Sequence, residues 1–127
     1  MTTNNKDIVQ RALSALLGTR NVDALTPFMT EDFVHHRPDA RRTKSEWLAA
    51  VQAALVPLAG MDVAIQHLVA DGDHVVMHSR RRLPAGPEIV VVDIFRLEAG
   101  RIAEAWEVIE PAVDATANFK WWERAKR

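Results

Sequence analysis

One carboxylate stands in the middle of a strongly apolar stretch of this 127-residue chain. The stretch runs Ile89-Val90-Val91-Val92-Asp93-Ile94-Phe95, so that both faces of an extended segment would be apolar around the acid. A buried carboxylate is costly unless it is paired with a cation, is raised in pKa or faces a cavity. Asp93 is therefore either a structural partner of a nearby arginine or loop, or a candidate acid/base group.

Glu107 lies within reach of Asp93 if the chain turns back at Glu98-Ala99-Gly100. A three-residue hairpin loop with Gly100 in the left-handed conformation predicts Asp93 opposite Ala105 and diagonal to Glu107, roughly 7–8 Å away. Two such carboxylates raise one another's pKa, which suits a general acid or base near neutral pH. A loop one residue shorter or longer would undo this arrangement. The predicted shared face carries Val91, Asp93, Phe95, Ala103, Ala105 and Glu107.

Five histidines add candidates for proton transfer. His36 ends a short extended segment and His78 lies in a strand predicted beside that of Asp93, so we take both as candidate catalytic residues, although a lone histidine is more often structural. The pair His35-His36 lacks the spacing of a helical metal pair and no second cluster supports it, so we predict no metal site. Alternation splits Arg80-Arg81-Arg82 between two faces, which favours a solvated or partner-facing edge.

The elements that must position these residues follow a helix-first, strand-later order, which is typical of α+β domains. Apolar residues recur at helical spacing in three segments, and Thr43-Lys44-Ser45-Glu46 fits a capping box before the third. After Gly60 the period changes to two, with turn residues between the segments. The predicted helices span 8–17, 21–29 and 43–59, and the predicted strands 61–67, 74–83, 88–97 and 101–110, with a short extended piece at 32–37.

Composition limits the classes of function. Sixteen basic residues offset 17 acidic ones, so we expect no nucleic-acid or membrane partner. The chain has no cysteine and no tyrosine, which removes thiol chemistry and any phenolic proton donor. Its length suits one domain over residues 1–127, and its polar N-terminus and lack of a long apolar run predict a cytoplasmic protein. The tail 112–127 is only weakly periodic, although it contains Phe119, Trp121 and Trp122.

Three segments resemble, in order, the sequence signature of SnoaL-like polyketide cyclases. The segment Phe33-Val34-His35-His36-Arg37-Pro38 is similar to that family's Val-Gln-His-Asn-Pro, and Val76-Met77-His78-Ser79-Arg80 to its Val-Ala-Val-His-Ser. The final hairpin is the most specific part, because residues 91–109 resemble Asp-Ile-Phe-Arg, acidic-Gly-Lys-Ile and Glu-His-Trp-Asp. The resemblance covers nearly the whole domain, except the tail after Asp114.

The resemblance implies a cone-shaped nuclear transport factor 2-like fold, in which three N-terminal helices pack on a curved antiparallel sheet around an internal pocket. It also implies cofactor-free acid/base catalysis of intramolecular aldol type, with the final acid of the motif on Glu107 and a second pocket group on Asp93. Two departures matter: Ala105 replaces the motif histidine, and Glu107 is one methylene longer than the motif's aspartate. We expect the pocket walls to include Phe28, Phe33, Trp47, Val91, Phe95 and Ala105.

Three functions remain in competition. The first is a cyclase- or isomerase-type enzyme acting on a small apolar carbonyl compound without a cofactor. The second is a module that binds a small apolar ligand without turning it over, which the loss of the motif histidine favours. The third is a dimeric accessory domain, and it can coexist with either pocket role. We expect a homodimer formed through the outer sheet face, which would carry Val90, Val92, Ile94, Trp106 and Val108.

Overall fold

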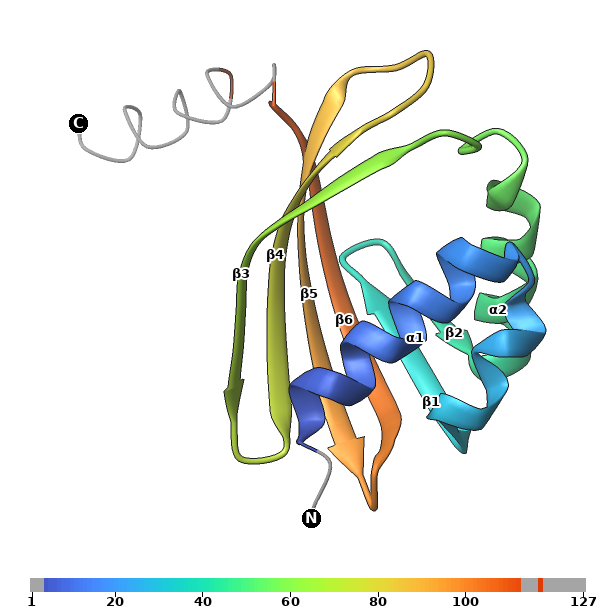
Figure 1. Cartoon of the computed structure of the whole chain (residues 1–127), viewed down its shortest axis with the longest axis vertical. Helices are drawn as coiled ribbons and strands as arrows, with labels where there is room; N and C mark the ends of the chain where they lie inside the picture. Colours follow the sequence, from blue (N-terminus) through green and yellow to red (C-terminus); the bar gives the residue numbers. More distant parts are fainter. Residues whose placement is uncertain (1–3, 113–116, 118–127) are drawn as a thin grey trace.

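The computed structural model describes residues 4–112 and 117, and a curved, unclosed sheet of six strands forms its framework (Figure 1). The strand order is β2-β1-β6-β5-β4-β3. The elements in chain order are α1 (Asn5–Thr19), the 3-10 helices η1 (Val22–Ala24) and η2 (Thr26–Phe28), β1 (Met29–Arg37), β2 (Ala40–Thr43), α2 (Lys44–Leu55), β3 (Asp62–Asp71), β4 (His74–Arg82), β5 (Glu88–Glu98) and β6 (Arg101–Pro111). This is the predicted α+β architecture, with α1, the 3-10 helices and α2 before the four strands β3 to β6.

Local capping explains where the two α-helices begin. The Asn4 side chain accepts a hydrogen bond from the Asp7 backbone at the start of α1. At α2, the Thr43 side chain accepts from the Glu46 backbone while the Glu46 carboxylate accepts from the Thr43 backbone, so the predicted capping box is confirmed. The end of α1 differs from the prediction, because Arg20, not Gly18, adopts the left-handed conformation that closes the helix.

The second predicted helix is a pair of short 3-10 turns. Asn21 caps the first turn as predicted, since its side chain accepts from the Asp23 backbone. Thr26 precedes Pro27, and the residue before a proline is disfavoured in α-helical geometry, so a regular helix does not form across this point. Met29 therefore belongs to β1 and not to a helix, and β1 is longer than the predicted piece at 32–37.

The sheet is not antiparallel throughout, which corrects the prediction. Strand β1 pairs with β6 in parallel, with His35 beside Ala105 and His36 beside Trp106. The short strand β2, which was not predicted, pairs antiparallel with β1. A parallel neighbour is reached only through a long connection, so no local turn signal announces it. The four strands β3 to β6 form the predicted meander, all in antiparallel pairs.

The β5–β6 hairpin differs from the predicted loop but preserves the predicted face. The loop is the two residues Ala99 and Gly100, both with positive φ (50° and 80°), which matches the twist of a two-residue hairpin. This loop alone would shift the register by one residue, but an irregularity between Arg96 and Leu97 shifts it again. Asp93 consequently lies directly opposite Glu107, and not diagonal to it.

The core lies between the inner sheet face and the helical segments. In Figure 1, α1 crosses in front of the sheet on the side where α2 also lies. Ile8, Val9 and Ala12 form the buried face of α1. The buried cluster that they join contains Leu25, Met29, Phe33, Val75, Leu97, Ile102 and Ala105. The tail residues Phe119, Trp121 and Trp122 lie outside the described residues.

Candidate functional site

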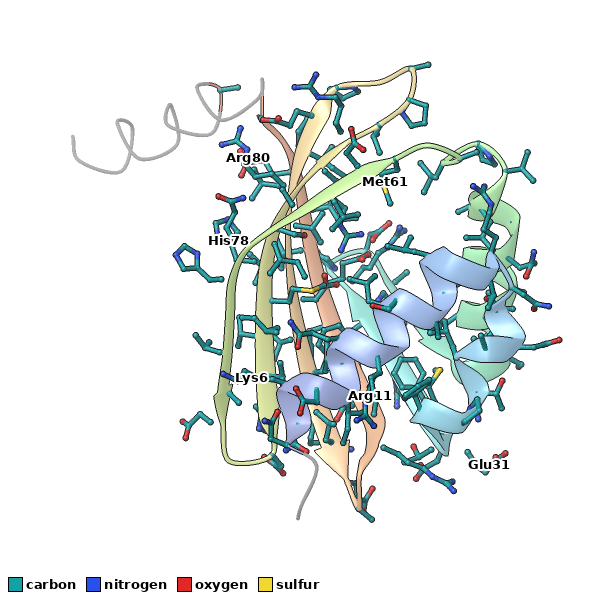
Figure 2. The ribbon with its side chains drawn as sticks, viewed as in Figure 1. Lys6, Arg11, Glu31, Met61, His78 and Arg80 are labelled. Carbon is teal, nitrogen blue, oxygen red and sulfur yellow. The ribbon has the colours of Figure 1, made fainter. Side chains whose placement is uncertain are left out.

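A cavity of about 670 Å³ lies between the inner sheet face and the helices. Its apolar wall is made by α1, α2 and the inner face of the sheet, and Met61 contributes from the segment that leads to β3 (Figure 2). The charged and polar side chains in its lining come mainly from the sheet. They are Arg20, His35, Arg37, Arg42, Arg81, Asp93 and Glu107.

Asp93 and Glu107 line this cavity from adjacent strands. Asp93 is only 6% exposed, and the two residues are direct partners across the β5–β6 pair. Side chains on directly opposed residues are closer than those on a diagonal, so the two carboxyl groups are nearer than the predicted register would have placed them. The Arg81 guanidinium donates to Asp93 Oδ2 at 3.0 Å and to the Ser79 hydroxyl at 3.2 Å, so the acid pair is anchored from β4.

Burial and the positive charge of Arg81 act in opposite directions on the pKa of Asp93. The pKa of Asp93 is raised to about 7, mainly by burial and also by the charge of Glu107, while the Arg81 charge acts in the opposite direction. A hydrogen bond with the Glu107 side chain also raises the pKa of Asp93, because it favours the protonated form of Asp93, which can donate that bond. Near neutral pH Asp93 can therefore both release and accept a proton.

His35, not His36, is the histidine in the cavity wall. His35 is 4% exposed and its ring stacks on Trp47 at a centroid distance of 5.3 Å. The pKa of His35 is lowered to about 4, mainly by burial and also by the charges of Arg37 and Arg42, so the imidazole is neutral at physiological pH. The alternation of buried Phe33 and His35 along β1 could have identified this residue from the sequence.

His36 and His78, the two histidines taken as candidate catalytic residues, do not line the cavity. The His36 ring stacks on Trp106, and its Nε2 lies 2.6 Å from the Glu104 carboxylate. The His78 ring stacks on His67, and Figure 2 shows His78 directed away from the helices. Side chains alternate between the two faces along a strand. His36 and His78 each follow a residue that lines the cavity, so their rings lie on the outer face of the sheet.

The expected pocket walls are partly correct. Phe33, Trp47, Phe95 and Ala105 line the cavity together with the two acids. Phe28 packs against the buried cluster instead. Val91 is fully buried within the sheet and its side chain also does not reach the cavity.

Arg81 corrects the interpretation of the arginine run as a solvated edge. Arg81 faces inward to Asp93 with a side chain that is 16% exposed, whereas Arg80 pairs with Glu88 on the outer face (Figure 2). Alternation predicts that the run is split between two faces, but it does not identify the inward member as the cation of the acid pair. Once the β4–β5 register is known, alternation along both strands places Arg81 on the same face as Asp93.

The described residues contain no group of three or more histidine, cysteine or acidic side chains arranged to hold a metal ion. The cavity wall offers a buried carboxyl group with a raised pKa, a second carboxyl group beside it, a neutral imidazole and guanidinium groups. Among residues 4–112 and 117, no helix is long and apolar enough to cross a membrane.

Residues 9–105 match the model of a family described as the SnoaL-like domain. The match covers more than half of the chain and ends two residues before Glu107. A comparison with curated proteins found no match.

Several solved structures share the fold at low sequence identity. IdmH of Streptomyces antibioticus, described as a candidate polyketide cyclase, is 21% identical with a TM-score of 0.70, covering 92% of this chain and 99% of that one. A nuclear transport factor 2-like protein of unknown function from Cytophaga hutchinsonii is 18% identical with a TM-score of 0.71, covering 87% and 94%. A candidate ketosteroid isomerase from Kribbella flavida is 16% identical with a TM-score of 0.72, covering 84% and 78%. At these identities the likeness concerns the fold.

Proposed function

The chain belongs to the SnoaL-like domain family, and from this premise we propose that it catalyses cofactor-free proton transfer on a small, largely apolar carbonyl compound. The observation that carries the proposal is the Asp93–Glu107 pair, directly opposed in the cavity wall, with the pKa of Asp93 at about 7. A group with a pKa near the working pH is the most effective proton donor and acceptor. Neighbours described as cyclase and isomerase candidates on the same fold support this class of reaction.

The chemistry needs one base and one acid, and the pair supplies both. The ionised carboxylate removes a proton from the carbon next to the carbonyl, and the electron pair of that C–H bond moves into the forming enolate. The protonated carboxyl donates a hydrogen bond or its proton to the carbonyl oxygen, where negative charge develops. Arg81 holds Asp93 in place and adds positive charge near the oxygen. The enolate then adds to a second carbonyl, or is reprotonated at another carbon.

A binding module is the second candidate, and Ala105 is the observation that favours it. Ala105 is 3% exposed, lines the cavity and offers no hydrogen-bonding group where the resembled motif has a histidine. In that case the acid pair would have no catalytic use and would only shape the polar end of the cavity. This candidate predicts ligand binding with no proton transfer from carbon.

Proton exchange with solvent tests the enzyme directly. The protein is incubated in D₂O with 2-tetralone, and loss of the α-proton signal is followed by NMR. Because each acid serves as donor or acceptor, Asp93→Asn and Glu107→Gln should each slow the catalysed exchange by about 10²-fold or more. Asp62→Asn, an exposed acid at the start of β3, is the matched control and should leave the rate unchanged.

The same variants distinguish an enzyme from a binding module. Equal exchange by wild type and both pocket variants would refute the carboxylate mechanism. Binding of the ketone with no exchange above the buffer rate would identify a binding module. Affinity for the ketone should stay within a few-fold in Asp93→Asn, because the amide keeps the shape of the acid.

We also propose that two copies pair through the outer sheet face. Val69 and Val108 are 55% and 53% exposed there, and Trp106 lies between the His36 and His74 rings. Exposed apolar groups on a sheet face that neither α1 nor α2 covers are typical of an interface. This pairing leaves the cavity on the opposite face of each copy accessible to a ligand.

A further inference from the structure

A second set of polar side chains lines the cavity near the acid pair, and all of them are basic. His35 and Arg42 are direct partners across the β1–β2 hairpin. Arg37 follows His35 by two residues on β1, so it shares the same sheet face. All three side chains line the cavity. We call His35, Arg37 and Arg42 the basic cluster.

No acidic side chain in the cavity wall forms a salt bridge with the basic cluster in the described part of the chain. Within the described part of the chain, Arg42 forms no salt bridge, and the salt bridge of Arg37 is to Asp39, which is 72% exposed. Arg37 Nε and His35 Nδ1 are buried without a hydrogen-bond partner in residues 4–112 and 117. The carboxylate of Glu46 interacts with the charge of Arg42, but its hydrogen bond is used to cap α2.

Such a cluster is electrostatically incomplete. A guanidinium that is partly removed from water loses hydration, and a buried N–H without an acceptor loses a hydrogen bond. Burial keeps the His35 ring neutral, and the charges of Arg37 and Arg42 lower its pKa as well, so both guanidinium groups act at this point of the wall. An anionic oxygen group of a ligand would supply both the missing charge and the missing acceptor.

The basic cluster lies close enough to the acid pair for one ligand to reach both. Strand β1 is the parallel neighbour of β6, and His35 lies beside Ala105, two residues before Glu107. Ala105 separates the basic cluster from the acid pair and contributes only a methyl group. A single ligand can therefore extend across Ala105 from one polar group to the other, with its apolar body against Trp47 and the helices.

We propose that the ligand of this cavity carries a carboxylate or another acidic oxygen group, which Arg37 and Arg42 bind while the carbonyl lies at Asp93 and Glu107. The substrate class is then an apolar keto acid or a similarly acidic carbonyl compound. This proposal rests on the proposed function for the second half of the ligand only. Arg81 is excluded from the anion-binding role because it is engaged with Asp93.

A matched pair of fluorescent probes tests the anion site without a known substrate. The probes are 1-anilinonaphthalene-8-sulfonate and the uncharged N-phenyl-1-naphthylamine, which share the apolar rings and differ in the sulfonate. Titrations are done at pH 7 with the whole chain, and displacement of the uncharged probe by the sulfonate shows that both occupy one cavity. We expect the wild type to bind the sulfonate more tightly than the uncharged probe.

Charge removal should affect only the anionic probe. Arg42→Gln and Arg37→Gln should each weaken the sulfonate by about tenfold and leave the uncharged probe within a factor of about two, since a charge-assisted hydrogen bond is lost. Arg42→Lys should restore part of the affinity. The control is Arg41→Gln, the exposed neighbour on β2, which should leave the affinity for the sulfonate unchanged.

The outcomes distinguish the two proposals. Equal weakening of both probes in Arg42→Gln would indicate lost packing and would overturn the anion site, as would unchanged binding in both arginine variants. Tight sulfonate binding without displacement of the uncharged probe would place the anion elsewhere and would also overturn it. Asp93→Asn should retain the sulfonate preference, so failure of the proton-exchange test with an intact preference refutes the catalytic role alone.

Discussion

Replacing Asp93 by asparagine should stabilise the folded protein, and the gain should grow with pH. Burial makes the ionised carboxylate unfavourable in the folded state, and the asparagine amide would keep the shape of the protonated acid without the charge. Asp93 is 6% exposed, so solvent screening of this effect is small. The prediction therefore tests the same electrostatic imbalance that supports the acid/base proposal.

The sign follows from which state releases its proton first. Below pH 3.8, Asp93 is protonated in both states and contributes no pH dependence. As the pH rises, the unfolded chain ionises first, which favours unfolding, until the folded protein also ionises at a pKa of about 7. The difference between the pKa of 3.8 in the unfolded chain and about 7 in the folded protein corresponds to about 4 kcal/mol at pH 8.

Urea unfolding of wild type and Asp93→Asn at pH 3.5, 5.5 and 8 measures this difference. The free energy of unfolding of the variant minus that of the wild type should rise from near zero at pH 3.5 to about 4 kcal/mol at pH 8. Asp62→Asn should show no comparable rise. A variant that is less stable than wild type at pH 8 would show that the ion pair with Arg81 outweighs the burial of the charge, and the reasoning would be wrong.

Two further predictions concern the effect of His35 on stability and the pairing of two copies through the outer sheet face. Because the pKa of His35 is lowered from 6.5 to about 4, the unfolded chain binds its proton first, so His35 should reduce stability by up to about 3 kcal/mol as the pH falls from 6.5 to 4. His35→Asn should lessen this loss in urea unfolding, whereas the exposed His67→Asn should not. For the outer face, sedimentation velocity should show a wild-type dimer at micromolar concentration and a Val108→Glu monomer, because the new carboxylates would oppose one another across the interface. A wild-type monomer would contradict the pairing.

Much of the architecture follows from local patterns. The capping box at Thr43 and Glu46 and the change of period after Gly60 predict α2 and the meander from β3 to β6, because caps and alternation depend on residues close in sequence. The same alternation predicts that Asp93 and Glu107 share a face. The resemblance to SnoaL-like cyclases predicts the family, which the match over residues 9–105 confirms.

The residue types of the site follow from the sequence, but the pairing of distant strands determines which of these residues meet. The irregularity beside Leu97 restored the shared face after a shorter loop had shifted it, and it made Asp93 and Glu107 direct partners. The parallel pairing of β1 with β6 brought His35, and not His36, beside the acid pair. These outcomes depend on hydrogen bonds between segments far apart in the chain, where a shift of one residue reverses the face of every side chain and leaves no local signal.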